Sequence, residues 1–178
     1  MPVPETVQTA RLIGTRIRPE HLDDLYQLYR DPRVMKTLSV DGLPFPDEQT
    51  QQSLRRQLDR WEHEGLGLWA WHDREDGHFV GRGGLQRDEE TGIELAYAVV
   101  ADDWRKGFAA EIGAASLEIG FAQLGLAEIV CFTLPTNIAS RRTMEKLGFV
   151  YERDFVHAGL PHVFYRLTAE RWARDRRG

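Results

Sequence analysis

The residues of this chain with the clearest chemical potential lie at positions 104–109, where a strand-like pattern gives way to a helical one. They read Trp104, Arg105, Lys106, Gly107, Phe108 and Ala109. Residues 93–100 before them alternate as a strand does. The first amide groups of a helix have no internal partner, and the helix dipole favours an anion there. This strand-to-helix junction therefore predicts a phosphate-binding site.

The glycine spacing excludes two common phosphate loops. A P-loop needs Gly-x-x-x-x-Gly-Lys-Ser/Thr, and the chain has no such run. A dinucleotide-binding loop needs Gly-x-Gly-x-x-Gly, whereas the nearest candidate, at residues 81–84, has Gln86 at the third glycine position and lies in a predicted strand. An ordinary helix start capped by Asp102 or Asp103 remains the structural alternative for the junction.

The elements that must position this junction follow from hydrophobic periodicity. Strands are expected at residues 11–18, 68–72, 79–85, 93–100, 128–133, 150–157 and 163–167. Helices are expected at residues 19–31, 47–64, 105–124 and 137–146 and after Thr168, whereas residues 33–46 read as irregular. Asp47, Asn137 and Thr168 are predicted helix caps, and residues 158–162 a hairpin loop.

Short loops favour antiparallel pairing for most of these strands, but one connection differs. The strand at 93–100, the helix at 105–124 and the apolar strand at 128–133 form a crossover unit, whose strands run parallel. Gly113 and Gly120 inside that helix predict close packing against a sheet, since each costs about 1 kcal/mol relative to alanine. The fold class is therefore α+β, with a mixed, mostly antiparallel sheet, a central parallel pair of strands and flanking helices.

Composition limits the classes of function. The 178 residues predict a single domain over residues 1–178, with 42% hydrophobic and 29% charged residues. The net charge of −5 argues against nucleic-acid binding, and the absence of a long apolar run argues against a membrane span. We expect a cytoplasmic protein.

Other reactive residue types give no separate site. The lone cysteine, Cys131, lies in an apolar run and reads as a buried small side chain. The six histidines show no metal-ligand spacing, so no metal site is predicted. Trp69 and Trp71 alternate on one strand face, which suits either the core or the wall of a substrate cleft.

Three segments resemble the GCN5-related N-acetyltransferases (GNAT). Residues 104–109 are similar to the family's acyl-CoA loop, Gln/Arg-x-x-Gly-x-Gly/Ala, with Trp104 at the first position as in the RimJ/RimL-like branch. Residues 137–149 (Asn-Ile-Ala-Ser-Arg-Arg-Thr-Met-Glu-Lys-Leu-Gly-Phe) resemble that branch's Asn-x-x-Ser … Glu-Lys-Leu-Gly-Phe helix. The opening residues 11–35 are also similar. Together the segments fall within residues 10–167, in the family's order.

The resemblance implies acetyl-CoA as cosubstrate and no metal. The pyrophosphate would be held by the amides of Arg105, Lys106, Gly107, Phe108 and Ala109, with added charge from Lys106. The pantetheine arm would pair with the strand edge that is exposed where the two parallel strands splay apart, with Val99 as backbone donor and acceptor. A plain strand end is the alternative there. Asn137 would contact the arm as well as cap its helix.

Two catalytic roles follow from the same resemblance. An alkylammonium has a pKa of about 10 and must lose a proton to attack a thioester. Glu94 lies where many family members keep a glutamate base, although a surface-facing strand carboxylate is an equal alternative; His72 and Glu111 are weaker candidates. The usual tyrosine acid is replaced by Met144. The branch's substitute is Ser140, which also reads as a serine that bonds to backbone at a helix start.

The function implied is transfer of an acetyl group from acetyl-CoA to a primary amine, by direct attack in a ternary complex. The acceptor is either a protein N-terminus or a small molecule such as a polyamine, amino acid or aminoglycoside, and homodimerisation stays open. A non-catalytic acyl-CoA sensor is the alternative, motivated by Met144. A plain interaction domain with a vestigial loop is a third hypothesis.

Overall fold

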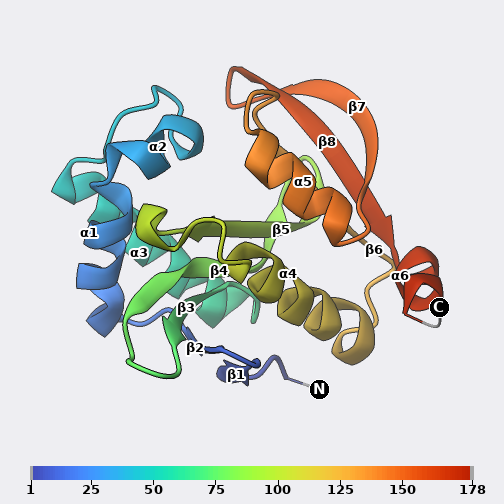
Figure 1. Cartoon of the computed structure of the whole chain (residues 1–178), viewed down its shortest axis with the longest axis horizontal. Coiled ribbons are helices and arrows are strands. Elements are labelled where there is room, and N and C mark those ends of the chain that lie inside the picture. The colour runs from blue at the N-terminus through green and yellow to red at the C-terminus, as the bar shows by residue number, and fades with distance from the viewer. Residues whose placement is uncertain (1, 177–178) are drawn as a thin grey trace.

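The computed structural model describes residues 2–176 as an eight-stranded mixed sheet with helices on both faces (Figure 1). The strands are β1 (Thr6–Gln8), β2 (Leu12–Arg16), β3 (Leu68–Asp73), β4 (Phe79–Asp88), β5 (Gly92–Val99), β6 (Glu128–Thr133), β7 (Val150–His157) and β8 (Leu160–Thr168). The helices are α1 (Leu22–Tyr29), α2 (Pro32–Leu38), α3 (Asp47–His63), α4 (Phe108–Glu118), α5 (Ile138–Lys146) and α6 (Ala169–Asp175).

The strand order is β1-β2-β3-β4-β5-β6-β8-β7. Neighbouring strands run antiparallel except β5 and β6, which run parallel. The predicted fold class, with its central parallel pair, is therefore confirmed. None of the helices within residues 2–176 combines the length and the apolar character that a bilayer crossing requires.

Each face of the sheet has its own hydrophobic core. On one face Leu54 of α3 belongs to a cluster with Ala98 of β5. On the other face Ile112 of α4 and Met144 of α5 belong to a cluster with Leu95 of β5. Because strand side chains alternate between faces, β5 presents even-numbered residues to α1–α3 and odd-numbered residues to α4 and α5.

The segment expected to be irregular, residues 33–46, contains α2. The side chain of Asp31 accepts a hydrogen bond from Arg33 N at 2.9 Å, and Pro32 occupies the first helical position. Asp followed by Pro is therefore a helix start here, because proline is favoured where the amide would be unpaired in any case. The sequence prediction read the same pair only as the end of α1.

The crossover helix is shorter than predicted. The expected start at residue 105 is wrong, because Arg105 and Gly107 have left-handed φ angles of 65° and 83° and α4 begins at Phe108. The chain continues past α4 as a π-helical turn, Ile119–Gln123. A Cβ on Gly120 would lie 2.6 Å from Ile129 of β6, which confirms the packing expected there. A Cβ on Gly113 would instead lie 2.5 Å from the side chain of Leu147, just after α5.

Smaller differences from the predictions concern one edge strand, one helix start and one hairpin turn. The hydrophobic pattern does not predict β1, a three-residue strand at the sheet edge. Asp47 is the first helical residue of α3 and Pro46 occupies the cap position, so the predicted cap is displaced by one residue. The last hairpin turns through Ala158 and Gly159 alone, both with positive φ, as two-residue hairpin turns require. The predicted caps Asn137 and Thr168 are confirmed.

Gly81 gives a direct test of the packing between β4 and β5. A Cβ built on it would lie 2.2 Å from the carbonyl oxygen of Ala98 and 2.9 Å from Cα of Val99. These are backbone atoms, so no side-chain rotation relieves the contact. We expect Gly81→Ala to lower the free energy of unfolding by about 2 kcal/mol, measured by urea denaturation. An unchanged unfolding midpoint would show that the two strands separate at little cost.

Candidate active site

The parallel pairing of β5 with β6 is very short. Only Glu94 and Val130 are paired across it, whereas β5 pairs with β4 along its whole length. Beyond Glu94 the two parallel strands therefore diverge, and one edge of β5 is left open toward β6. This is the opening that the sequence prediction places beside Val99.

Neighbouring hydrogen bonds show which backbone groups face the opening. Val100 N donates to Val80 O of β4 at 2.9 Å. Because successive residues direct their backbone groups to opposite edges of a strand, those of Val99 face β6. The Val99 carbonyl accepts a hydrogen bond from Trp104 Nε1 at 2.8 Å. A pantetheine arm would use the Val99 amide freely but would share this carbonyl with Trp104 or displace the indole.

The loop at residues 104–109 leads from this strand end into α4. Gly107 occupies the cap position in a left-handed conformation, and no side chain caps the helix. Phe108 is buried, so only its backbone is available to a ligand, and Ala109 is half-buried. The first turn of α4 therefore presents amide groups without side-chain partners, as an anion site requires.

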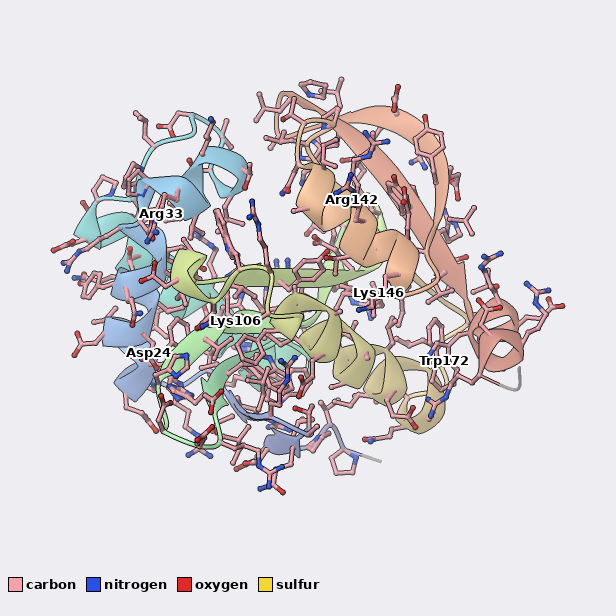
Figure 2. The ribbon with its side chains drawn as sticks, viewed as in Figure 1. Asp24, Arg33, Lys106, Arg142, Lys146 and Trp172 are labelled. Carbon is pink, nitrogen blue, oxygen red and sulfur yellow. The ribbon has the colours of Figure 1, made fainter. Side chains whose placement is uncertain are left out.

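The capping alternative for this loop is wrong. The buried carboxylate of Asp103 accepts from Lys106 Nζ at 2.6 Å and lies 2.8 Å from His78 Nε2. Hydrogen bonds to Asp76 and Asp103 raise the pKa of His78. Asp103 thus anchors the loop to the connection between β3 and β4 instead of capping α4. Figure 2 shows Lys106 just before α4.

A cluster that the sequence did not predict ties the loop to the N-terminal segment. Arg11 Nη1 donates to Lys106 O at 2.8 Å, and the Arg11 guanidinium lies 4.4 Å from the Phe108 ring centre. Glu111 accepts from Arg11 Nε at 2.7 Å and from Thr9 Oγ1 at 2.5 Å. Partial burial acts to raise the pKa of Glu111, but these hydrogen bonds outweigh it and the pKa is lowered. These contacts tie Glu111 to the N-terminal segment at the start of α4.

Glu94 lies at the point where the parallel strands begin to diverge, on the face covered by α1–α3. Its side chain is half-buried, and Gln86 Nε2 donates to Glu94 Oε2 at 3.1 Å. Burial raises the pKa of Glu94 to about 7, although the hydrogen bond from Gln86 acts in the opposite direction. A carboxylate that titrates near neutral pH can accept a proton from an ammonium group.

Ser140 lies across the opening, on α5. Asn137 Oδ1 accepts from Ser140 N at 3.2 Å, which is the predicted cap of this helix. The Tyr97 hydroxyl lies 3.0 Å from the Ser140 hydroxyl and 3.3 Å from Ser140 O, so its single hydrogen can be donated to either oxygen. Met144 is fully buried, so its side chain serves the core.

Tyr97 is a site residue that sequence reasoning missed. It lies on β5 three positions after Glu94 and therefore points to the opposite face, toward α5. Burial raises the pKa of Tyr97, so its hydroxyl stays neutral and can act as a hydrogen-bond donor. Its odd-numbered position on an alternating strand predicts the face but not the partner on α5.

The remaining candidates lie outside the opening. His72 Nε2 is 2.9 Å from Asp24 Oδ2, beside α1. Trp69 and Trp71 are fully buried, so of their two predicted roles the core role is correct. Carboxylates and histidines do gather on exposed turns, for example Asp73, Asp76 and His78. These three residues lie within six consecutive positions of the chain, so their proximity is local.

Comparison with known proteins is consistent across sequence and structure. A family model described as an acetyltransferase (GNAT) domain matches residues 11–150. YkkB of Bacillus subtilis (strain 168) is 30% identical over 164 residues, which cover 87% of this chain and 94% of that protein. FsC-acetyl coenzyme A-N(2)-transacetylase of Aspergillus fumigatus is 29% identical over 188 residues, which cover 95% of this chain and 78% of that protein.

Solved structures share the fold at low sequence identity. The GNAT-family acetyltransferase from Bacillus anthracis has a TM-score of 0.77 at 22% identity, over 93% of this chain and 99% of that one. Ribosomal-protein-S5-alanine acetyltransferase from Vibrio fischeri has a TM-score of 0.74 at 14% identity, over 94% of this chain and 98% of that one. Aminoglycoside acetyltransferase AAC(6')-Ib in complex with coenzyme A has a TM-score of 0.76 at 17% identity, over 93% of this chain and 99% of that one.

The family match spans most of the chain and includes the loop before α4, the divergence of β5 from β6 and the first turn of α5. This chain therefore belongs to the GCN5-related N-acetyltransferase (GNAT) family and is an acetyl-CoA-dependent acetyltransferase.

Proposed function

We propose that this enzyme acetylates a primary amine by direct attack in a ternary complex, with Glu94 as general base. The observation that carries the proposal is the position of Glu94. Its carboxylate lies where β5 and β6 diverge, and it titrates at about pH 7 on the face away from α4. Cosubstrate and acceptor would then reach the opening from opposite faces of the sheet.

In this scheme α4 holds the cosubstrate. The amides of Arg105, Lys106, Gly107, Phe108 and Ala109 bind the pyrophosphate, and Asn137 and the backbone of Val99 contact the pantetheine arm. The uncapped start of α4 supports the first assignment. The ion pair of Lys106 with Asp103 limits the charge that Lys106 offers, so the amides carry most of the binding.

The ammonium group first loses one proton to Glu94, directly or through water. The neutral amine nitrogen then attacks the thioester carbon and a C–N bond forms. The C–S bond breaks, the sulfur leaves with its electron pair and takes a proton from Ser140, and the second proton that the nitrogen loses in becoming an amide restores the Ser140 hydroxyl. A thiol pKa of about 8.5 makes the thiolate a tolerable leaving group, so a weak donor suffices.

Tyr97 should act with Ser140. When the Tyr97 hydroxyl donates to Ser140 Oγ, the serine hydrogen is free to point at the sulfur. We expect Tyr97→Phe and Ser140→Ala each to lower kcat about tenfold, the value of one hydrogen bond to a charged group. The double variant should lose little more than either single one, because the two hydroxyls act as a unit. Multiplicative losses in steady-state kinetics would show that they act independently.

The acceptor is a protein N-terminus or a small amine. The branch resemblance and the fold shared with the S5-alanine acetyltransferase support the first, and the fold shared with AAC(6')-Ib supports the second. Residues 33–64 and the β7–β8 turn flank the acceptor side and would set the choice. We infer a cytoplasmic enzyme of the RimJ/RimL-like branch and leave a homodimer as a hypothesis for sedimentation analysis.

A thiol-release screen of amines and N-terminal peptides tests the proposal. Wild type should release CoA with at least one acceptor, and Glu94→Gln and Ser140→Ala should be slower with that acceptor. Full activity in both variants would overturn both catalytic roles. Binding of acetyl-CoA without thiol release for any acceptor would favour the non-catalytic sensor.

A further inference from the structure

The carboxylate of Glu94 is the end of a chain of side-chain amides that begins in α3. Leu68 N donates to Gln57 Oε1 at 3.3 Å, Gln57 Nε2 donates to Gln86 Oε1 at 3.4 Å, and Gln86 Nε2 donates to Glu94 Oε2 at 3.1 Å. Gln86 and Glu94 are directly paired across β4 and β5, so their side chains share one face. Gln57 is buried, and Gln86 and Glu94 are half-buried.

We propose that Gln57 and Gln86 are positioning residues that present an amide N–H to Glu94 and thereby hold it in its ionised, proton-accepting form. This inference rests on the proposed role of Glu94 as the base. Neither glutamine is expected to touch the reacting atoms.

The orientation of each amide in this series of hydrogen bonds is fixed at its buried end, Gln57. A backbone N–H can only donate, so the oxygen of Gln57 must face Leu68 and its NH₂ group must face Gln86. The oxygen of Gln86 then accepts, and its NH₂ group must face Glu94. A carboxylate accepts this hydrogen bond in its ionised form, whereas a reversed Gln86 would offer an oxygen and favour the protonated form.

Other groups around Glu94 also bear on its charge. Asp88 and Arg82 of β4 and His157 of β7 act on it at longer range, and its own charge acts on the thiol of Cys131. Arg82 and His157 have partners of their own, since Arg82 Nε donates to the Tyr29 hydroxyl at 2.7 Å and His157 lies 3.4 Å from Glu90. Gln86 is the group that contacts the carboxylate directly.

Gln57 and Gln86, called the relay below, should control how Glu94 titrates. Gln86→Met keeps the side-chain length and removes the donor, so the pKa of Glu94 should rise by about one unit. Gln57→Met frees Gln86 to reverse, so the rise should be smaller and of the same sign. Gln57→Glu still accepts from Leu68 N but also attracts the Gln86 NH₂ group, which turns the Gln86 oxygen toward Glu94. That variant should give the largest rise.

The measurement is a carbon NMR titration of the ligand-free protein with ¹³C in the glutamate side-chain carboxyl groups. The Glu94 resonance is assigned by its loss in Glu94→Gln. Gln52 of α3 is exposed, so Gln52→Met is the matched control and should leave the midpoint unchanged. Acetyl-CoA affinity, measured by calorimetry, should stay at the wild-type value in every folded variant, because the relay lies on the face away from α4.

The outcomes separate the relay from the proposed function. An unchanged midpoint in Gln86→Met, or a fall in either Gln57 variant, overturns the relay. A shift in Gln86→Met without one in Gln57→Glu overturns the fixed direction and leaves Gln86 as a lone neighbour. These readings stand whatever the activity of Glu94→Gln. Full activity of Glu94→Gln would instead remove the catalytic reason for the relay.

Discussion

Replacing Glu94 by glutamine should lower kcat by about 10² to 10⁴-fold, the usual contribution of a positioned general base. The substitution keeps the size of the side chain and its hydrogen bond to Gln86, but it removes the group that takes the ammonium proton. An amine with a pKa of about 10 is almost entirely protonated at pH 7. The loss of kcat therefore arises in the deprotonation that makes the amine nucleophilic.

The pH dependence gives this prediction a distinct signature. The base acts when ionised, and its pKa is about 7, so wild-type kcat should rise about tenfold per pH unit below pH 7 and level off above it. Glu94→Gln should lack this limb. Ionisation of the acceptor itself is common to both proteins, so the difference between the two profiles belongs to Glu94. The profiles are measured by thiol release at saturating acetyl-CoA.

Glu111→Gln is the matched control, because the sequence also offers Glu111 as a candidate base. The carboxylate of Glu111 is held by Thr9 and Arg11 on the α4 side of the sheet, away from the acceptor face. We expect its substitution to lower the melting temperature and to leave the pH profile in place. A wild-type profile for Glu94→Gln together with a lost limb for Glu111→Gln would transfer the role of base to Glu111.

The sequence was sufficient for the parts of the site that are local in the chain. The alternation of residues 93–100 and the apolar run at residues 128–133 predicted the parallel pair, and the loop before α4 was found from its glycine. The predicted start of α4 differs from the observed start by three residues. Arg105 has a left-handed backbone, which a non-glycine residue adopts rarely and which its residue type does not predict.

The contacts that tune the site lay beyond sequence reasoning because each joins distant elements. Gln57 on α3, Gln86 on β4 and Glu94 on β5 are joined by successive hydrogen bonds, and no hydrophobic periodicity predicts this arrangement. The alternating pattern predicts a strand at Tyr97, whereas its contact with Ser140 depends on how α5 packs over β5. Pattern fixes which face a side chain occupies, whereas its partner depends on packing between elements.

Replacing Gly107 by alanine should weaken acetyl-CoA binding by about tenfold or more. Gly107 has a φ angle of 83°, where an L-residue is strained by about 1 to 2 kcal/mol. The loop can relieve this strain by rotating the backbone on either side of Gly107, which would turn the first amides of α4 away from the pyrophosphate. A loss of 1.4 kcal/mol in binding corresponds to one factor of ten in Kd.

Gly125 provides the matched control for this experiment. It follows the same helical segment, has a φ angle of 64°, and a Cβ built there would meet no atom within 4 Å. Gly125→Ala should therefore carry similar backbone strain without any effect on the start of α4. Calorimetric titration should show reduced acetyl-CoA affinity for Gly107→Ala alone, while both variants lose similar stability to urea. Equal affinities in the two variants would mean that the loop amides do not hold the cosubstrate.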